Sequence, residues 1–190
     1  MAKQIEGVYE RILECAKKEF LEKGYTDASL RTIAAEAETS TNSIYVRFKD
    51  KEGLFAAIVE PVSEEFMSRC LDVQETFHSF DSDVQRREVG KYSSDAMLGM
   101  VDYIYDHFDE FRLLLDASHG TKFCNFVNGL VSMEEADFYH MMVTAYFEGI
   151  FEVVRHGMDR EDAKKYVAMM GKYHHGGFLA IVGEETAETK

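Results

Sequence analysis

The feature that most restricts the fold is a near absence of helix breakers, since Pro61 is the single proline in 190 residues. Proline breaks helices because it lacks an N–H donor and has a fixed φ. Long helices are therefore possible along most of the chain. Apolar residues recur at helical spacing, and no segment sustains the period-two alternation of a half-buried strand. The sequence predicts an all-α fold.

Cysteine usage and hydropathy indicate the compartment. The three cysteines, Cys15, Cys70 and Cys124, are odd in number and lie among helical apolar positions. This favours reduced thiols over a disulfide framework. No apolar run approaches the roughly 20 residues of a membrane span, and the N-terminus lacks the apolar core of a secretion signal. We expect a cytoplasmic protein with no membrane partner.

Three helices are expected in the first 50 residues. The first spans about 3–23 and ends at Gly24, because glycine is common just past a helix end. Two short helices follow over about 29–37 and 40–48, each opening on a serine, which is a favoured N-cap. The link Glu38-Thr39 is so short that these two helices must cross steeply. This is the geometry of a helix-turn-helix motif.

The remainder predicts a helical body. A long helix begins near residue 51 and is expected to be interrupted or kinked near Pro61. Five more helices are expected, over about 84–107, 110–117, 122–131, 133–156 and 159–183. We therefore expect two domains, a three-helix DNA-binding head over 1–50 and a helical effector-binding and dimerisation domain over 51–190.

The third helix has the side chains of a DNA-reading element. In a helix-turn-helix, the first residues of the second helix face the major groove. Asparagine can pair there with adenine, and arginine with guanine. The candidates for base contact are Thr41, Asn42, Ser43, Tyr45 and Arg47, and those for phosphate contact are Ser29, Arg31, Thr32, Lys49 and Lys51. Spacing alone leaves a solvated helical hairpin equally open.

The formal net charge of −14 is concentrated outside this stretch. Residues 1–60 hold nine Lys and Arg against eleven Asp and Glu, and residues 41–51 hold three basic side chains against one acidic. The acidic body would discourage non-specific binding of DNA elsewhere on the protein.

The segments ILECAKKEFLEKGY, SLRTIAAEA and STNSIYVRFKDKEGLF resemble the DNA-binding head of the TetR family of bacterial transcriptional repressors. The resemblance implies that Tyr45 and Lys51 bind phosphates and that the third helix reads bases. It further implies a homodimer and a small-molecule effector pocket among the C-terminal helices. We expect the dimer to bind palindromic operator DNA, and we expect neither a cofactor nor catalytic residues. The matching positions are Ile12, Ala16, Phe20, Gly24, Ser29, Ile33, Ala34, Ala37, Ser40, Ile44, Tyr45, Phe48, Lys51, Glu52 and Leu54.

The chain departs from the family pattern at two places. The family usually has Gly-Val in the turn where this chain has Glu38-Thr39. A non-glycine residue in a left-handed turn costs about 1 kcal/mol, and Glu38 adds negative charge near DNA. The family often has glycine at the position of Asn42, so Asn42 is expected to reach further into the groove.

A second class, a metal-binding helical-bundle protein or enzyme with a vestigial head, is the alternative. Di-iron bundles use Glu-x-x-His pairs, and this chain has seven histidines. It lacks HExxH, CxxC and a glycine-rich phosphate loop, so we expect no metal site. The acid-x-x-His pairs are Glu75 with His78, Asp116 with His119, and Asp137 with His140.

The body is rich in side chains that suit an apolar pocket or a dimer interface, with 14 Phe, 10 Tyr and 10 Met in the chain. We expect a small apolar or amphipathic effector that releases the operator. Helix position suggests pocket residues Phe66, Cys70, Met97, Val101, Ile104, Leu114, Val127, Met142 and Tyr146. It suggests dimer-interface residues Phe147, Phe151, Val154, Val167, Met170, His174, Phe178 and Ile181.

Overall fold

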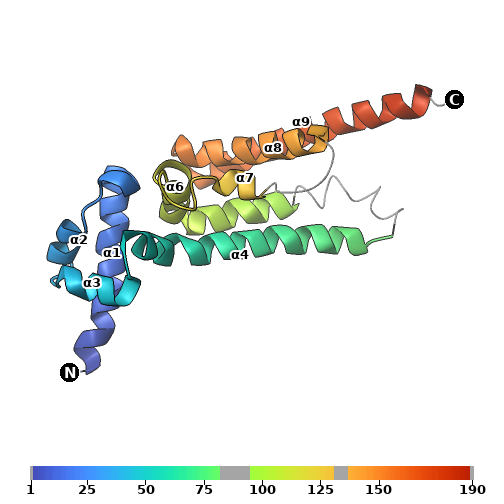
Figure 1. The fold of residues 1–190 in the computed structure, drawn as a ribbon. Helices are drawn as coiled ribbons and strands as arrows, with labels where there is room; N and C mark the ends of the chain where they lie inside the picture. Colours follow the sequence, from blue (N-terminus) through green and yellow to red (C-terminus); the bar gives the residue numbers. More distant parts are fainter. Residues whose placement is uncertain (1, 82–94, 131–136, 189–190) are drawn as a thin grey trace. The chain divides into compact units, whose positions relative to one another are not determined.

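The computed structural model describes residues 2–81, 95–130 and 137–188 (Figure 1). Every regular element in these ranges is an α-helix, which confirms the all-α prediction. The chain forms two compact units: residues 1–65 with 107–130, and residues 66–106 with 131–190. Compactness does not report which residues bind DNA, so the functional division at residue 50 stays a prediction.

The first unit holds the N-terminal helices together with two helices from the middle of the chain. Helix α4 (Lys51–Ser79) contributes its first half to this unit and its second half to the other. The remaining helices of the first unit are α1 (Ala2–Asp27), α2 (Leu30–Glu36), α3 (Thr41–Phe48), α6 (Phe108–Asp116) and α7 (Phe126–Leu130).

The helix boundaries near the N-terminus follow from local chemistry. Gly24 adopts φ 72° and ψ 168°, which ends the regular helical geometry of α1 where the sequence predicts. The Oγ of Ser29 accepts the N–H of Thr32 at 3.4 Å, and the Oγ of Ser40 accepts the N–H of Ser43 at 3.2 Å. Both predicted serine caps are confirmed.

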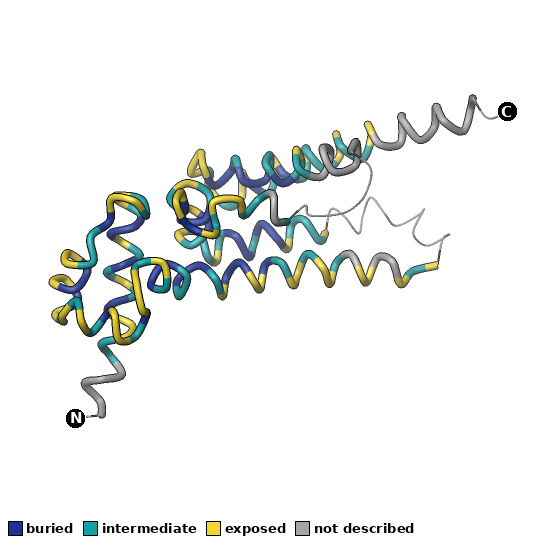
Figure 2. Tube along the Cα trace, in the orientation of Figure 1, coloured by how far each residue is buried: buried dark blue, intermediate teal, exposed yellow. Residues whose placement is uncertain are grey.

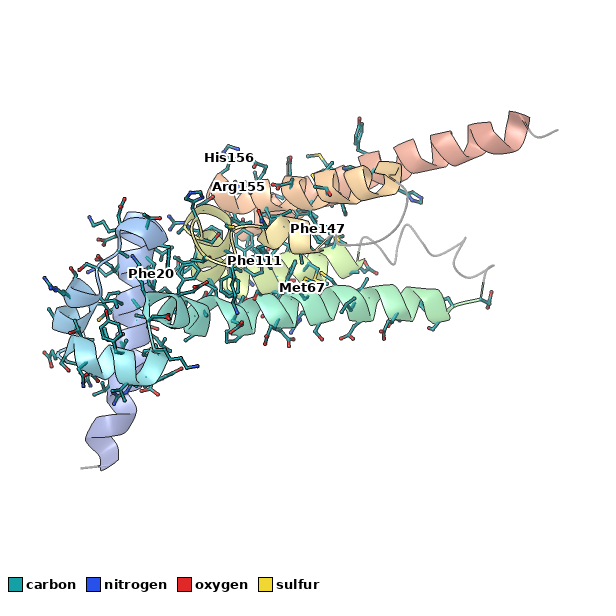
Figure 3. The ribbon with its side chains drawn as sticks, viewed as in Figure 1. Phe20, Met67, Phe111, Phe147, Arg155 and His156 are labelled. Carbon is teal, nitrogen blue, oxygen red and sulfur yellow. The ribbon has the colours of Figure 1, made fainter. Side chains whose placement is uncertain are left out.

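Aromatic side chains form the centre of the first unit. Phe20 and Phe55 are fully buried, and their rings meet edge to face with centroids 5.1 Å apart. Tyr25 contacts both rings. Figure 2 shows buried positions recurring along α1 and α4, and Figure 3 labels Phe20 and Phe111. The apolar stripe of α1 therefore packs as its spacing predicts.

Helix α6 and the loop after it pack directly on the head helices. Phe111 of α6 is fully buried. The N–H of Tyr25 donates to the carbonyl of Ala117 at 3.0 Å, and Phe123 lies 6.1 Å from Phe55 between ring centroids. A helix predicted as part of the body thus belongs to the same compact unit as α1–α3.

The second unit is built from the second half of α4, a helical segment over 95–106, and helices α8 (Asp137–Arg155) and α9 (Arg160–Glu188). The ring of Phe66 lies 6.2 Å from Tyr103 and 6.0 Å from Phe151. Gly157, at φ 58°, separates α8 from α9 as predicted. The start of the helix expected over 84–107 lies outside the described residues.

Helix α4 runs from Lys51 to Ser79 with Pro61 inside it, so an interruption at Pro61 is wrong, and the alternative of a kink stays a prediction. Pro61 is exposed to solvent. Water can therefore hydrate the carbonyl that loses its helical N–H partner, which lowers the cost of proline at this position. None of the described helices combines the length and apolarity needed to cross a membrane.

Candidate nucleic-acid interface

Helix α3 is fixed to the head by two apolar side chains and presents the rest outward. Ile44 and Phe48 are buried, with exposed fractions of 0% and 5%. Asn42, Tyr45 and Val46 are exposed. The alternation gives α3 one face that packs on the head and one that is open to solvent, as the helix-turn-helix prediction requires.

The turn between α2 and α3 has the left-handed residue that the family resemblance implies. Glu38 adopts φ 52°, a conformation unfavourable for residues with a Cβ atom. The N–H of Thr39 donates to the carbonyl of Ala34 at 2.9 Å and closes the end of α2. The chain therefore accepts backbone strain at Glu38 to bring the two helices together.

Arg47 is held by its own helix. Its Nη1 donates to the Oγ of Ser43 at 2.6 Å and to the carbonyl of Ser43 at 3.1 Å. The guanidinium must leave at least one of these bonds, or turn another of its N–H groups outward, to read a guanine. Base contact by Arg47 stays a prediction.

Lys51 has a structural role beside any contact with DNA. Its Nζ donates to the carbonyls of Thr26 at 2.9 Å and Ala28 at 3.0 Å, and it lies 4.8 Å from the ring centroid of Tyr25. An ammonium group has three donors. One donor therefore remains for a phosphate, while the other two tie the start of α4 to the α1–α2 turn.

An open hollow of about 590 Å³ lies beside α3. It brings together five of the ten predicted DNA contacts from three helices, Tyr45 and Lys51 among them. Such a mixture of hydroxyl and basic groups suits a phosphate. The lining residues are Ala28, Ser29, Leu30, Arg31, Thr41, Tyr45 and Lys51.

The other five candidates also lie on or next to these helices. Asn42 is exposed on α3, with Ser43 and Arg47 on its flank. Thr32 is exposed on α2, and Lys49 is exposed at the end of α3, where it adopts φ 70°. The ten predicted residues thus share one region of the first unit, and their contacts with DNA stay predictions.

Two residues that position the interface were missed by the sequence reasoning. The buried carboxylate of Glu19 accepts the N–H of Ser29 at 3.0 Å and so fixes the start of α2. Glu19 lies seven residues after Ile12 on the apolar face of α1, and this carboxylate within an apolar stripe was the available signal. The Oδ1 of Asp50 accepts the N–H of Gly53 at 2.7 Å and caps α4.

The predicted pocket residues divide between the two units. Leu114 and Val127 belong to the first unit. Phe66, Val101 and Ile104 are fully buried in the second unit. Cys70, Met97 and Tyr146 are half-buried there, and the side chain of Met142 lies outside the described set. Burial raises the pKa of the Cys70 thiol to about 12 and raises the pKa of Tyr146.

Half of the predicted dimer-interface residues pack inside their own chain. Phe147, Phe151, Val154 and Val167 have exposed fractions of 8% or less, so they offer little surface to a second copy. Met170 contacts Gly149 on α8, while His174 meets Tyr146 with ring centroids 4.8 Å apart. The side chains of Phe178 and Ile181 lie outside the described set. Figure 3 labels Phe147, Arg155 and His156 on and after α8.

The alternative of a metal-binding bundle gains no support from the described residues, among which no group of three His, Cys, Asp or Glu could hold a metal ion. Asp116 and His119 are both exposed. The side chains of His78, Asp137 and His140 lie outside the described set, so the other two pairs are not tested.

The region that holds the candidate interface is similar to known proteins. Residues 12–58 match the family described as bacterial regulatory proteins, tetR family. The chain is 40% identical over 60 residues to the uncharacterized HTH-type transcriptional regulator YvdT of Bacillus subtilis (strain 168). This match covers 32% of the chain and 31% of YvdT, so the chain spans about a third of that relative's length.

Two solved structures share the fold over most of the chain. The TetR family transcriptional regulator PfmR from Thermus thermophilus has a TM-score of 0.60 at 16% identity, covering 86% of this chain and 96% of that one. NalD, the secondary repressor of the MexAB-OprM multidrug efflux pump in Pseudomonas aeruginosa, has a TM-score of 0.58 at 19% identity, covering 89% and 97%. Residues 12–58 thus match the tetR family of bacterial regulatory proteins, and the chain shares its all-α fold with these two solved structures.

Proposed function

We propose that the chain is a repressor that binds a palindromic operator as a homodimer and is released by a small apolar or amphipathic effector. The observation that carries the proposal is the outer face of α3, which is exposed, carries the amide of Asn42 and lies next to the hollow lined by Tyr45 and Lys51. The shared fold with NalD, which is a repressor, supports a repressor role for this chain.

The DNA-binding part is tested with duplexes from the chain's own upstream region, by fluorescence anisotropy at several salt concentrations. We expect specific binding whose affinity falls steeply with salt, because released counterions drive phosphate contacts. Asn42→Ala should relax the preference at one base position per half-site. Asn125→Ala, at an exposed position outside the interface, is the matched control and should leave the preference unchanged. Equal affinity of the wild type for specific and scrambled duplexes contradicts an operator-binding function.

The homodimer is proposed through the exposed face of α9. Two heads must be held about 34–36 Å apart to occupy successive major grooves. Tyr166, Met169 and Tyr173 are 36%, 64% and 80% exposed, and their spacing of three and four residues places them on one side of α9. A row of exposed apolar side chains on one helix suits an isologous interface.

Sedimentation at micromolar concentration tests the interface. We expect a dimer for the wild type and for Tyr173→Phe, which keeps the ring. Tyr173→Glu should shift the mass toward a monomer, because it places a charge in an apolar contact. A wild-type monomer, or a Tyr173→Glu dimer of undiminished affinity, contradicts this assignment.

Effector binding is proposed for the second unit. Phe66, Val101 and Ile104 are buried there, and the raised pKa of Cys70 reflects an apolar environment. Apolar side chains with few polar groups are typical of small-molecule sites. The acidic body disfavours strongly anionic effectors.

A thermal-shift screen of drugs, lipids and dyes finds ligands, and operator binding is then repeated with each ligand. An effector and the operator must weaken one another by the same factor, typically about 5–150-fold. Ligands that stabilise the protein and leave operator affinity unchanged would exclude the proposal that an effector releases the operator. They would still support a ligand-binding site.

A further inference from the structure

The outermost side chain of α3 is apolar, and the DNA-contact prediction does not include it. Val46 is 74% exposed. Among the described residues of the first unit, the large apolar side chains that are exposed are Tyr9, Tyr45 and Val46. Tyr9 stacks on Phe48 at 5.2 Å between centroids. Tyr45 and Val46 therefore place exposed apolar surface on α3 itself.

The register of α3 sets the direction of Val46. Successive residues of an α-helix are rotated by about 100°. Ile44 and Phe48 define the buried side, and the direction opposite to their mean is that of Val46, with Asn42 about 40° to one side. These two residues are four apart and are neighbours on the helix surface. They form the part of α3 that would enter the major groove most deeply.

The neighbouring side chains leave this edge uncovered. Ser43 and Arg47 lie on one flank of α3, where they bond to each other. Tyr45 and Thr41 lie on the other flank and line the hollow. Asn42 and Val46 thus present one amide and one branched apolar group side by side.

Thymine is the one standard base that offers a methyl group in the major groove, whereas cytosine offers a C–H at the same position. An asparagine amide pairs with the N6 and N7 atoms of adenine. Along the axis of α3, positions 42 and 46 are about 6 Å apart, which is about two base-pair steps of roughly 3.4 Å.

We infer that Val46 determines specificity by packing on a thymine methyl group, one or two base pairs from an adenine that Asn42 reads. The inference rests on the proposed function, since it concerns the same DNA surface. Valine suits this contact because it is nearly fixed in one rotamer in a helix, so little side-chain entropy is lost. Burying one methyl group corresponds to about fourfold in affinity for each half-site.

The experiment begins with selection of wild-type binding sites from a random duplex pool. Each thymine of the selected site is then replaced by deoxyuridine, which removes only the methyl group. We expect one position per half-site where the wild type loses about fourfold in affinity. Val46→Ala should bind the thymine and uracil duplexes equally, and Val46→Ile should keep the discrimination. Thermal unfolding of each variant checks that the exposed position tolerates the change.

Three outcomes overturn the inference in distinguishable ways. A wild type that binds selected DNA but ignores every thymine-to-uracil change removes the role of a methyl contact. A Val46→Ala protein that keeps the full uracil penalty assigns the methyl contact to another residue. A wild type for which no duplex is enriched overturns the proposed function as well.

Discussion

The Nζ of Lys17 on α1 lies 2.8 Å from the Oε1 of Glu110 on α6, and the two side chains are 24% and 15% exposed. Burial alone would lower the pKa of Lys17, but its hydrogen bond to Glu110 and the charge of that carboxylate raise it above the ordinary value. The pair therefore fastens α1 to α6, a helix from the middle of the chain.

Breaking this pair should destabilise the first unit. We expect Lys17→Met and Glu110→Gln each to lower the free energy of unfolding by about 1–2 kcal/mol, between the effects for exposed and buried pairs. The double variant should lose less free energy of unfolding than the sum of the losses in the two single variants. Because the pKa of Lys17 is raised in the folded state, the contribution is present at neutral pH and disappears as the pH rises past the lysine range. Urea unfolding measures the free energy of unfolding of each variant. Lys18→Met is the control, because the partner of Lys18, Glu36, is 3.9 Å away and exposed.

Relieving the strain at Glu38 should stabilise the head. Glu38→Gly permits the observed φ of 52° without a Cβ penalty, so we expect a gain of about 1 kcal/mol, or roughly 2–4 °C in Tm. Operator affinity should also rise because a negative charge is removed. Glu38→Gln separates the effects, since it should raise affinity without raising Tm. An unchanged Tm for Glu38→Gly would show that the turn is not strained.

The two lysines after α3 should differ in what they affect. Lys49→Ala should reduce the salt slope of DNA binding by about one unit and leave stability unchanged, since Lys49 is exposed. Lys51→Ala should reduce the slope by a similar amount and also lower Tm, because it frees the carbonyls of Thr26 and Ala28. Both should weaken binding about equally on all sequences. A Lys51→Ala protein with altered base preference and an unchanged salt slope contradicts the phosphate assignment.

Gly53 cannot be replaced without moving the start of α4. A Cβ atom added there would lie 1.9 Å from the carbonyl oxygen of Phe48. We expect Gly53→Ala to cost about 1–3 kcal/mol of stability, as an overpacked site does, and to weaken operator binding. Gly99→Ala is the matched control, because nothing lies within 4 Å of its added Cβ. In a helix this control should gain about 0.5–1 kcal/mol.

Cys70 should make the protein sensitive to alkali. Its pKa of about 12 in the folded state exceeds that of an unfolded thiol near 8.5. Below about pH 8.5 the thiol is protonated in both states, so its raised pKa does not change the free energy of unfolding. Above that pH only the unfolded state ionises, and the free energy of unfolding falls by roughly 1.4 kcal/mol for each pH unit toward 12. Cys70→Ala should flatten this fall in urea unfolding measured from pH 8 to 10.5 under reducing conditions. Cys124→Ala changes an exposed thiol and serves as the control. Equal slopes for wild type and Cys70→Ala would contradict the buried state of the thiol.

Residues adjacent in sequence were enough to predict the helix caps and helix ends. The serine caps and the helix end at Gly24 depend on a few adjacent residues and were predicted from them, whereas the left-handed Glu38 was implied by the family resemblance. The positioning contacts were not predicted, because their partners are distant in sequence. The carboxylate of Glu110 lies 93 residues beyond Lys17, and Thr26 precedes Lys51 by 25.

Apolar periodicity predicted buried faces on the last two helices but not what covers them. Phe151 and Val167 have the spacing of interface residues, yet they are buried inside the chain. The exposed apolar residues of α9 include Met169 and Tyr173, which periodicity alone does not separate from the core. The distinction depends on how α8 and α9 pair, and pairing is a long-range property.

The packing of α6 against the head has a consequence for protein engineering. A hybrid regulator made by joining residues 1–50 of this chain to the body of a relative would part Lys17 from Glu110 and Tyr25 from Ala117. A transplant that also carries residues 107–123 would keep these contacts, along with the ring contact between Phe55 and Phe123 if the start of α4 moves with it. The exchangeable piece of this protein is therefore discontinuous in sequence, although its helix-turn-helix motif is continuous.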